Sequence, residues 1–348
     1  MLQARCQICG KTGLISNALK TCADCIRNKP VQAMPSIEKV HAESRLRFGL
    51  PSEPPGEGVR CGRCVNDCRI PSGESGYCGL SVDVSGVVQC YYDPLPTNCV
   101  ASHVCPNRTK YGYKNLAVFY GACSFNCLFC QNWHYRRMAS RLAPMMSAEE
   151  LASFVDDKTA CICFFGGDPT PQLPHAIRTS KRAIERSKGI RICWESNGAM
   201  SHSLLKEVAE LSLQTGGIIK FDLKAWNEDL HKALCGVTNE RTLANFRWLA
   251  EYGEPSETFL VASTLLVPGY IDTEEVKYIA KFIADLNPSI PYSLLAFHPQ
   301  FYMGDLPTTT RKHAERCLLV AKAVGLENVR IGNVFFFADR KVINRNIS

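Results

Sequence analysis

Three cysteines stand at positions 123, 127 and 130, within the stretch YGACSFNCLFCQNW. Cysteine thiolates bind zinc ions and iron–sulfur clusters, and both kinds of site usually take four protein ligands. His134 is the nearest candidate for a fourth zinc ligand, but its spacing is uncommon for zinc and Trp133 crowds it. The stretch also lacks the ferredoxin run of CxxCxxC with a later Cys-Pro. Three thiolates on a [4Fe–4S] cluster would leave one iron open, where the amine and carboxylate of an amino acid can bind.

Two other groups of cysteines have the spacing of metal ligands. The first group reads CxxC, twelve residues, CxxC. A unit of about twenty residues cannot bury a core of its own, so this spacing predicts a zinc ribbon, with a small iron–sulfur site as the alternative. The second group reads CxxC, three residues, Cys, nine residues, Cys, which suits zinc and iron–sulfur clusters alike, with reduced structural thiols as the alternative. The groups are Cys6, Cys9, Cys22 and Cys25, and Cys61, Cys64, Cys68 and Cys78.

Seven further cysteines are interpreted as small buried or structural thiols, because they form no tight motif or lie inside or just after predicted strands. Cys235 comes soon after a predicted strand, close enough to face a cavity there, and is interpreted as a structural thiol. The others are Cys90, Cys99, Cys105, Cys161, Cys163 and Cys193.

Composition describes an ordinary globular protein. Of the 348 residues, 46% are hydrophobic and 21% are charged. No run approaches the ~20 apolar residues of a membrane span, and the N-terminus lacks the layout of a signal peptide, so we expect a cytoplasmic protein in which the nineteen cysteines stay reduced or bind metal. The net charge of +7 is spread along the chain and indicates a solvated surface; nucleic-acid binding stays open but is not favoured.

The chain divides into five regions by composition and pattern. Residues 1–30 hold the first cysteine group, and residues 31–58 combine a helix, with Ser36 as its expected N-cap, and a Pro/Gly-rich linker. Residues 59–114 form a cysteine-rich segment. Residues 115–338 alternate strand and helix patterns, and residues 339–348 are a C-terminal tail.

The alternation from residue 115 onward predicts an α/β fold. Strands are expected at 115–121, 160–167, 190–197, 218–224, 258–269 and 292–299, with helices at 147–157, 172–189, 201–217, 241–253 and 272–286. Ser147, Ser201 and Asp272 are the expected N-caps of three of these helices. This order implies a mostly parallel sheet, and six repeats fit a partial (β/α)6 TIM-like barrel.

Unusual residues follow each of the six predicted strands. The cysteine loop follows the first, GGDP the second, ESNG the third, DLK ends the fourth, VPG the fifth, and His298 ends the sixth. The carboxyl ends of the strands are where α/β barrels build their active sites, so we expect these residues to meet.

The chain resembles the radical S-adenosylmethionine (SAM) superfamily, whose hallmark is CxxxCxφC with an aromatic residue before the third cysteine. Cys123, Cys127, Phe129 and Cys130 match it. FFGGDPTPQ, DLK, VPGYIDTEEV and AKAVGLENVRIGNV resemble the branch of the pyruvate formate-lyase activating enzymes. FHPQFYMGDLPTTT and the cysteines at 61–78 are more similar to radical SAM proteins of the AmmeMemoRadiSam system. The resemblance covers residues 61–335.

The resemblance implies a [4Fe–4S] cluster on Cys123, Cys127 and Cys130, reductive cleavage of SAM, and a 5′-deoxyadenosyl radical that abstracts hydrogen. It also implies an electron donor such as ferredoxin or flavodoxin, and a protein or small-molecule substrate that the sequence does not identify. In this reading the methionine amine meets Gly166, Gly167 and Asp168, although the usual motif carries Glu at the last position. The expected further partners of SAM are Ser196, Asn197, Asp222, Lys224 and His298.

Three functions follow from these patterns. The first is a radical SAM enzyme, of which an activator of glycyl radical enzymes is one form. The second is a radical SAM enzyme that modifies RNA or protein, suggested by the N-terminal ribbon and the positive charge. The third and weakest is a zinc-dependent binding protein without catalysis.

Overall fold

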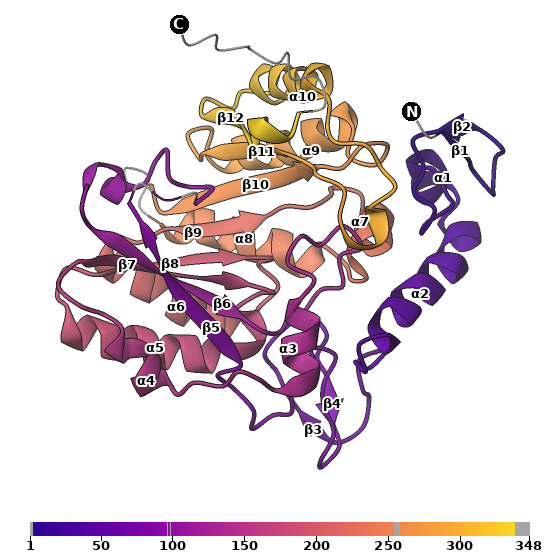
Figure 1. Ribbon diagram of the computed structural model, residues 1–348. Coiled ribbons are helices and arrows are strands. Elements are labelled where there is room, and N and C mark those ends of the chain that lie inside the picture. The colour runs from indigo at the N-terminus through magenta and orange to yellow at the C-terminus, as the bar shows by residue number, and fades with distance from the viewer. Residues whose placement is uncertain (1–2, 96, 98, 254–257, 338–348) are drawn as a thin grey trace, which may run out of the picture.

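The computed structural model describes residues 3–95, 97, 99–253 and 258–337, and its centre is an eight-stranded sheet. The strand order is β12-β11-β10-β9-β8-β7-β6-β5, in which β5 is antiparallel to β6 and all other neighbours are parallel (Figure 1). The strands are β5 (Val88–Pro94), β6 (Lys114–Tyr120), β7 (Thr159–Gly166), β8 (Arg191–Ser196), β9 (Ile219–Asp222), β10 (Leu260–Leu266), β11 (Tyr292–Ala296) and β12 (Val329–Gly332).

The prediction of a mostly parallel α/β sheet is confirmed, and all six predicted strands are present as β6 to β11. The edge strands β5 and β12 were not predicted, so the sheet has seven parallel strands where six were expected. Because β5 and β12 do not pair with each other, the sheet is open along one side. Side chains from β7 to β11 line one cavity, so the sheet curves around it as a partial barrel does.

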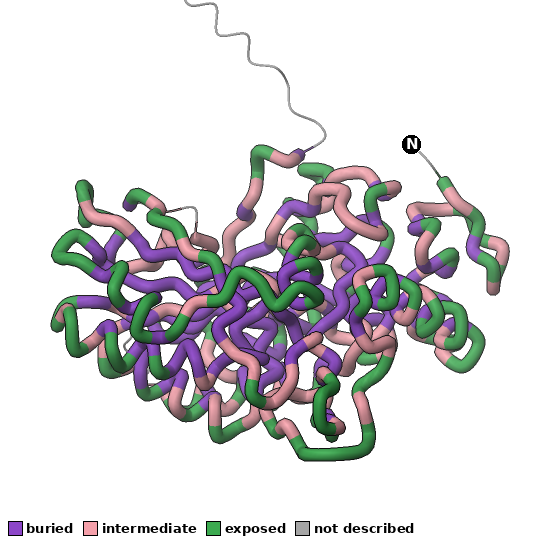
Figure 2. Tube along the Cα trace, turned by 60° about the horizontal axis from the view of Figure 1, so that its bottom comes forward, coloured by how far each residue is buried: buried purple, intermediate pink, exposed green. Residues whose placement is uncertain are grey.

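Helices follow the strands as the sequence pattern predicts, and buried residues concentrate along the sheet (Figure 2). Ser147 and Asp272 cap their helices by accepting hydrogen bonds from backbone N–H groups, whereas the side chain of Ser201 makes no such bond. The helices are α3 (Tyr135–Arg141), α4 (Ala148–Ser153), α5 (Leu173–Arg186), α6 (His202–Thr215), α7 (Glu228–Cys235), α8 (Glu240–Tyr252), α9 (Thr273–Leu286) and α10 (Arg311–Ala323), of which α3, α7 and α10 were not predicted.

The N-terminal region is a small unit that packs on the side of the larger domain. It contains β1 (Ala4–Arg5), β2 (Thr12–Gly13), α1 (Ala23–Asn28) and α2 (Pro30–Leu46), and both helices contact α7 (Figure 1). The prediction that a helix begins at Ser36 is wrong. Proline is favoured in the first turn of a helix, where it removes no hydrogen bond, and α2 begins at Pro30, so that Ser36 lies inside it and its hydroxyl donates to the carbonyl of Ala33.

The cysteine-rich segment after the linker forms the short hairpin of β3 (Val59–Arg60) and β4 (Arg69–Ile70). The predicted tail at 339–348 lies outside the described residues. Among the described helices, none is both long enough and apolar enough to cross a membrane.

Candidate functional site

The cysteine loop follows β6 and is buried against the ends of β7 and β8. Cys123 and Cys127 are buried, Cys130 is partly exposed, and all three line the same cavity. The backbone N–H of Phe125 donates to the Cys123 sulfur over 3.3 Å, which favours the thiolate form, although burial raises the pKa of this thiol well above its ordinary value. A zinc–sulfur bond of about 2.3 Å would place thiolates about 3.8 Å apart. In the part of the chain that the structure describes, the sulfurs of these three cysteines do not all lie within 4.8 Å of one another. They therefore lack the close spacing of a site for one ion.

A buried arginine lies beside this loop. Arg136 on α3 has no exposed surface, and one of its terminal nitrogens donates to the Asn126 side chain over 2.8 Å. Its Nε and other terminal nitrogen are buried without a hydrogen-bond partner. Burial raises the pKa of the Cys130 thiol, and the Arg136 guanidinium opposes that rise. A buried cation with unpartnered N–H groups beside three thiols needs an anion, and a cluster on three thiolates supplies one. The loop therefore fits a [4Fe–4S] cluster.

A fourth thiol also approaches the loop. Cys235, at the end of α7, is buried, and a hydrogen bond from its thiol lowers the pKa of Cys127 to about 7 despite burial, with the Lys224 ammonium acting in the same direction. The loop backbone is fixed to the same helix end, since the N–H of Asn126 donates to the carbonyl of Cys235 over 2.8 Å. The sequence placed Cys235 near the cavity but did not pair it with the cysteine loop.

Helix α2 reaches the cysteine loop through Asn126, which stands between the first two cysteines. The Asn126 side-chain nitrogen lies 2.8 Å from the Ser44 hydroxyl and 3.0 Å from Nδ1 of His41. The other His41 nitrogen lies 3.0 Å from the carbonyl of Ala233. The Asn126 side chain thus connects the N-terminal unit, the cysteine loop and Arg136.

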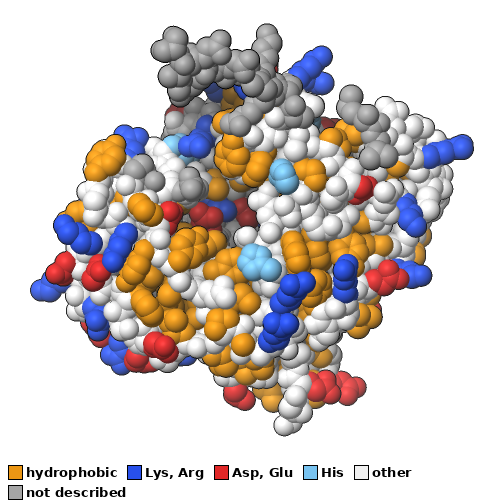
Figure 3. Space-filling model, in the orientation of Figure 1, with side chains coloured by type: hydrophobic (Ala, Val, Ile, Leu, Met, Phe, Trp, Pro, Cys, Tyr) orange, Lys and Arg blue, Asp and Glu red, His pale blue; other side chains and the backbone are white. Residues whose placement is uncertain are grey.

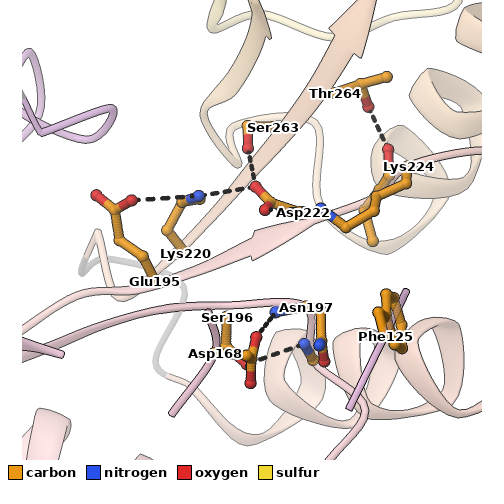
Figure 4. Close-up of polar contacts among 12 residues, drawn as sticks. Phe125, Asp168, Glu195, Ser196, Asn197, Lys220, Asp222, Lys224, Ser263 and Thr264 are labelled. Atoms are coloured by element: carbon orange, nitrogen blue, oxygen red, sulfur yellow. Dashed lines mark hydrogen bonds and ion pairs between the residues drawn. The ribbon is translucent and has the colours of Figure 1, made fainter. Parts of the chain in front are cut away.

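The GGDP motif ends β7 and forms a narrow wall of the cavity. Gly166 has a φ of 116°, a conformation that favours glycine, and a Cβ on Gly167 would collide with the carbonyl oxygen of Ala122. The Asp168 carboxylate accepts from the backbone N–H of Asn197 over 2.6 Å, from the N–H of Thr170 over 2.8 Å and from the Ser196 hydroxyl over 3.2 Å (Figure 4). Most of its acceptor capacity is therefore used within the protein, where it joins the end of β7 to the end of β8.

The DLK motif of β9 forms an ion-pair network with a lysine that the sequence analysis missed. Lys220 lies 2.7 Å from Asp222 and 3.4 Å from Glu195, and Lys224 lies 3.0 Å from the other oxygen of Asp222. The Ser263 hydroxyl donates to Asp222 over 2.7 Å (Figure 4). Burial raises the pKa of the Asp222 carboxyl, but the two ammonium groups outweigh that effect and hold the pKa well below its ordinary value. Asp222 is therefore ionised at neutral pH.

The structure brings seven of the eight predicted cofactor-binding residues to one cavity. The cavity has an empty volume of about 1060 Å³, including the part open to solvent, and Figure 3 shows a hollow that contains charged side chains. His298 is not among the described residues that line it, and its ring instead packs at 4.8 Å from that of Phe336. Asn333, with a φ of 55°, lines the cavity and was not predicted. The seven are Gly166, Gly167, Asp168, Ser196, Asn197, Asp222 and Lys224.

The four N-terminal cysteines form a tight site. All four sulfurs lie within 4.8 Å of one another, and those of Cys9 and Cys22 are 3.8 Å apart. Although burial acts to raise the pKa of Cys6, backbone N–H groups of Cys22, Cys9 and Ile8 lower it to about 6. This spacing fits a single ion with tetrahedral geometry on four thiolates.

The second predicted group is wider. Cys61, Cys64, Cys68 and Cys78 line one small cavity, and the N–H of Tyr77 donates to the Cys68 sulfur over 3.3 Å. In the described ranges no three of these sulfurs meet the 4.8 Å spacing of the N-terminal site. The segment touches the cysteine loop, because the Asn66 side chain donates to the carbonyl of Ser124 over 2.7 Å.

Comparison with known proteins points to the same superfamily that the cysteine loop resembles. Residues 117–283 match the family model of the radical SAM superfamily. An uncharacterized protein of Methanocaldococcus jannaschii is 28% identical over 291 residues, which cover 79% of this chain and 81% of that protein. The isethionate sulfite-lyase activating enzyme of Desulfovibrio desulfuricans is 34% identical over 135 residues, covering 38% of this chain and 40% of that enzyme.

Similarity to two further proteins is weaker. The pyruvate formate-lyase 1-activating enzyme of Escherichia coli is 25% identical over 199 residues, covering 54% of this chain and 78% of that enzyme. The solved structure of a domain of a pyruvate-formate lyase-activating enzyme from Bacteroides vulgatus superposes with a TM-score of 0.39 at 25% identity, covering 49% of this chain and 97% of that one.

Proposed function

The chain contains a radical SAM domain over residues 117–283, and from this premise we propose that it cleaves SAM reductively and directs the resulting radical to a C–H bond of a protein substrate. Members of this superfamily use a [4Fe–4S] cluster and SAM. When bound, the cluster supplies the electron that splits SAM into methionine and a 5′-deoxyadenosyl radical. The observation that carries the proposal is the buried Arg136 guanidinium, two of whose three nitrogens have no hydrogen-bond partner, beside three thiols that lack the close spacing of a single-ion site.

In this proposal Cys123, Cys127 and Cys130 hold the cluster, and Arg136 stabilises its negative charge. The thiol of Cys235 donates to Cys127, and hydrogen bonds to cluster sulfurs are one means by which proteins set the reduction potential. Burial of the loop excludes water from the reacting atoms.

We assign the binding of SAM to the cavity beside the loop. Asp222 and Lys224 offer an ionised carboxylate and an ammonium group, which suit the ribose hydroxyls and the methionine carboxylate. The glycines at 166 and 167 let the methionine amine approach the backbone closely. Asp168, Ser196 and Asn197 form the wall between β7 and β8, and Asp168 positions that wall through its own hydrogen bonds. A role for His298 remains a prediction.

A protein is the favoured substrate because two relatives are named activating enzymes for other enzymes. One form of this activity is the generation of a glycyl radical in a partner enzyme. That radical would appear as a doublet in the electron-spin-resonance spectrum of the partner. Modification of a peptide or another C–H bond would instead change the mass of the substrate.

Metal binding outside the cysteine loop is part of the proposal. Zinc on Cys6, Cys9, Cys22 and Cys25 suits the tight spacing of those sulfurs and would fold the N-terminal unit. A second zinc ion or an iron–sulfur cluster on Cys61, Cys64, Cys68 and Cys78 remains a prediction.

An acidic electron carrier, such as a flavodoxin or ferredoxin, is the proposed donor. A groove next to the cysteine loop is lined by Arg47, Arg137 and Arg141 together with Trp133 and Phe301, and no acidic residue is among the described residues that line it. The rings of Trp133 and Phe301 stack with centroids 6.0 Å apart. Trp133 is three residues from Cys130, so a carrier docked here would lie close to the cluster.

The test is anaerobic reconstitution of the full chain with iron and sulfide, addition of SAM and dithionite, and measurement of 5′-deoxyadenosine. Iron, sulfide and zinc are counted on the same samples. We expect 5′-deoxyadenosine from the wild type and none above background from Cys127→Ala. Cys317→Ala, which removes a buried thiol on α10 far along the chain, should behave as the wild type. A loaded cluster that yields no 5′-deoxyadenosine would refute the proposal.

A further inference from the structure

Lys220 is a buried lysine of β9 that lies two residues before the DLK motif and lines the cavity proposed for SAM. Its side chain is 6% exposed. Lys220, Asp222 and Lys224 occupy alternate positions of one extended segment, so their side chains point to the same side. Burial of an ammonium group is costly unless the group is paired with an anion. The partners of Lys220 therefore decide which role it can have.

Two carboxylates from neighbouring strands hold this ammonium group. The register of the sheet places Glu195 on β8 directly beside Lys220 on β9. The Lys220 nitrogen lies 2.7 Å from Asp222 and 3.4 Å from Glu195 (Figure 4). Burial lowers the pKa of Lys220, but the two carboxylates outweigh that effect and hold the pKa above its ordinary value. Lys220 is therefore charged, and it bridges one carboxylate of β8 and one of β9.

The two carboxylates depend on Lys220 to different degrees. Asp222 has a second ammonium partner, because Lys224 lies 3.0 Å from its other oxygen. Among the described residues Glu195 forms no other ion pair, and its other oxygen accepts a hydrogen bond from the Cys99 thiol over 3.2 Å. The Glu195 side chain is 20% exposed, so water solvates little of its charge. Without Lys220, Glu195 would be an unpaired carboxylate in the wall of the cavity.

This arrangement leaves the second lysine of the network available to a ligand. The Lys224 nitrogen lies 5.9 Å from the centre of the Phe129 ring, which belongs to the cysteine loop. Among the described residues Lys224 donates one side-chain hydrogen bond, to Asp222, whereas an ammonium group has three N–H donors. Because Lys220 supplies the remaining positive charge that Asp222 and Glu195 need, Lys224 can direct its other donors to a ligand.

We propose that Lys220 is a positioning residue for SAM, whose ammonium group satisfies the two carboxylates so that Lys224 stays available to the cofactor. This inference rests on the proposed function, in which Asp222 and Lys224 bind SAM, and it adds Lys220 and Glu195 to the site. If Lys220 is removed, the unpaired Glu195 competes with SAM for the ammonium group of Lys224. Removal of one buried charge is costly, whereas removal of both partners is nearly neutral. Removal of Glu195 as well should therefore restore SAM binding.

The experiment measures the affinity of the reconstituted full chain for SAM by isothermal titration calorimetry. We expect Lys220→Met to bind SAM about tenfold more weakly than the wild type, because a charged group loses its partner. The double variant Lys220→Met/Glu195→Gln should bind SAM within about threefold of the wild type, since both charges are gone. Lys181 and Glu207 form an exposed ion pair at 3.1 Å and provide the matched control. Lys181→Met and Lys181→Met/Glu207→Gln should bind SAM as the wild type does.

The outcomes separate this role from the proposed function. Equal SAM affinity in Lys220→Met and the wild type would overturn the role of Lys220 alone, and so would a double variant that binds SAM no better than Lys220→Met. If Lys220→Met does not fold, Lys220→Ala is prepared in ammonium chloride and exchanged into tetramethylammonium chloride. Ammonium ions can donate N–H groups in place of the lost one, so SAM affinity should be higher in ammonium chloride, and equal affinity in both salts would overturn the role. The expected affinities without formation of 5′-deoxyadenosine would refute the proposed function alone.

Discussion

Asp222 joins the charged groups of the SAM cavity. Its two carboxylate oxygens contact Lys220, Lys224 and Ser263, and Lys220 also pairs with Glu195. A carboxylate held between two ammonium groups is kept ionised and in one orientation, so it is ready to accept hydrogen bonds from a ligand. The charged groups of this site are therefore already ordered in the absence of a ligand.

Replacement of Asp222 tests this arrangement. Asp222→Asn keeps the shape of the side chain but leaves the two ammonium groups without their shared anion. We expect SAM to bind about tenfold to a hundredfold more weakly, because a hydrogen bond to a charged group contributes about 1.5–3 kcal/mol. Isothermal titration calorimetry on the reconstituted protein measures the change. Asp285→Asn, in an exposed ion pair with Lys281 on α9, is the control, and equal SAM affinity in both variants would contradict the assignment.

Sequence motifs located most of the site but not the residues that complete it. CxxxCxxC, GGDP and DLK were visible because each combines unusual residue types at the end of an apolar strand. Arg136 and Lys220 were not, since nothing in their neighbourhood indicates that a cation is buried there. His298 was expected in the cavity from its place after a strand, yet the chain turns it toward Phe336.

Helix α2 is one of the elements that attach the N-terminal unit to the larger domain, and one of its buried contacts is made by His41, whose ring lies 3.0 Å from the carbonyl of Ala233. Burial lowers the pKa of His41 to about 4, with the charges of Arg45 and Arg136 acting in the same direction. The pKa of an unfolded histidine is about 6.5. Between these two values the unfolded chain binds the proton and the folded chain does not, so the stability is complete above pH 6.5 and falls as the pH drops toward 4.

This difference predicts a pH dependence of stability. Between pH 7 and pH 5 the wild type should lose about 2 kcal/mol of unfolding free energy through His41. Urea unfolding at several pH values measures this loss. Between pH 7 and pH 5 the unfolding free energy of His41→Gln should fall by about 2 kcal/mol less than that of the wild type. His202→Gln changes an exposed histidine on α6 and serves as the control. If the unfolding free energies of His41→Gln and the wild type change equally with pH, the protonation of His41 does not affect stability.

Elements with continuous apolar runs were predicted well, and edge elements were not. The strands β6, β7 and β10 are nearly all buried, so their apolar runs are easy to recognise in the sequence. Strand β5 has mostly exposed or half-exposed residues because one of its faces is open, and β12 has only four residues. Pairing with β6 and β11, which no local pattern encodes, makes them strands.

At the scale of the whole molecule, the basic groove and the cavity proposed for SAM both border the end of the cysteine loop and share no described lining residue: Asn132 lines the cavity and Trp133 lines the groove. Arg137 and Arg141 are exposed on α3, and α3 begins only five residues after Cys130. In the proposed function an electron would enter from the groove while the substrate occupies the cavity. The two partners need not compete for the same surface.

Charge reversal in the groove should separate these two functions. With flavodoxin as donor, Arg137→Glu/Arg141→Glu should form 5′-deoxyadenosine about tenfold more slowly at low salt, because electrostatic attraction accelerates docking. With dithionite as donor the rate should equal that of the wild type. Lys206→Glu, on the exposed face of α6, should change neither rate. An equal loss with dithionite would show that the arginines serve the site rather than the carrier.

The contact between α2 and Asn126 has a consequence for the order in which the protein matures. Asn126 lies between two proposed cluster ligands, and the helix that holds it is preceded by the four-cysteine site. Free energy gained when a metal orders the N-terminal unit is then shared with the cysteine loop, and thermodynamic linkage makes that sharing reciprocal. A chain that acquires zinc early would present a more ordered loop for cluster assembly, and a chain that loses its cluster would release zinc more readily.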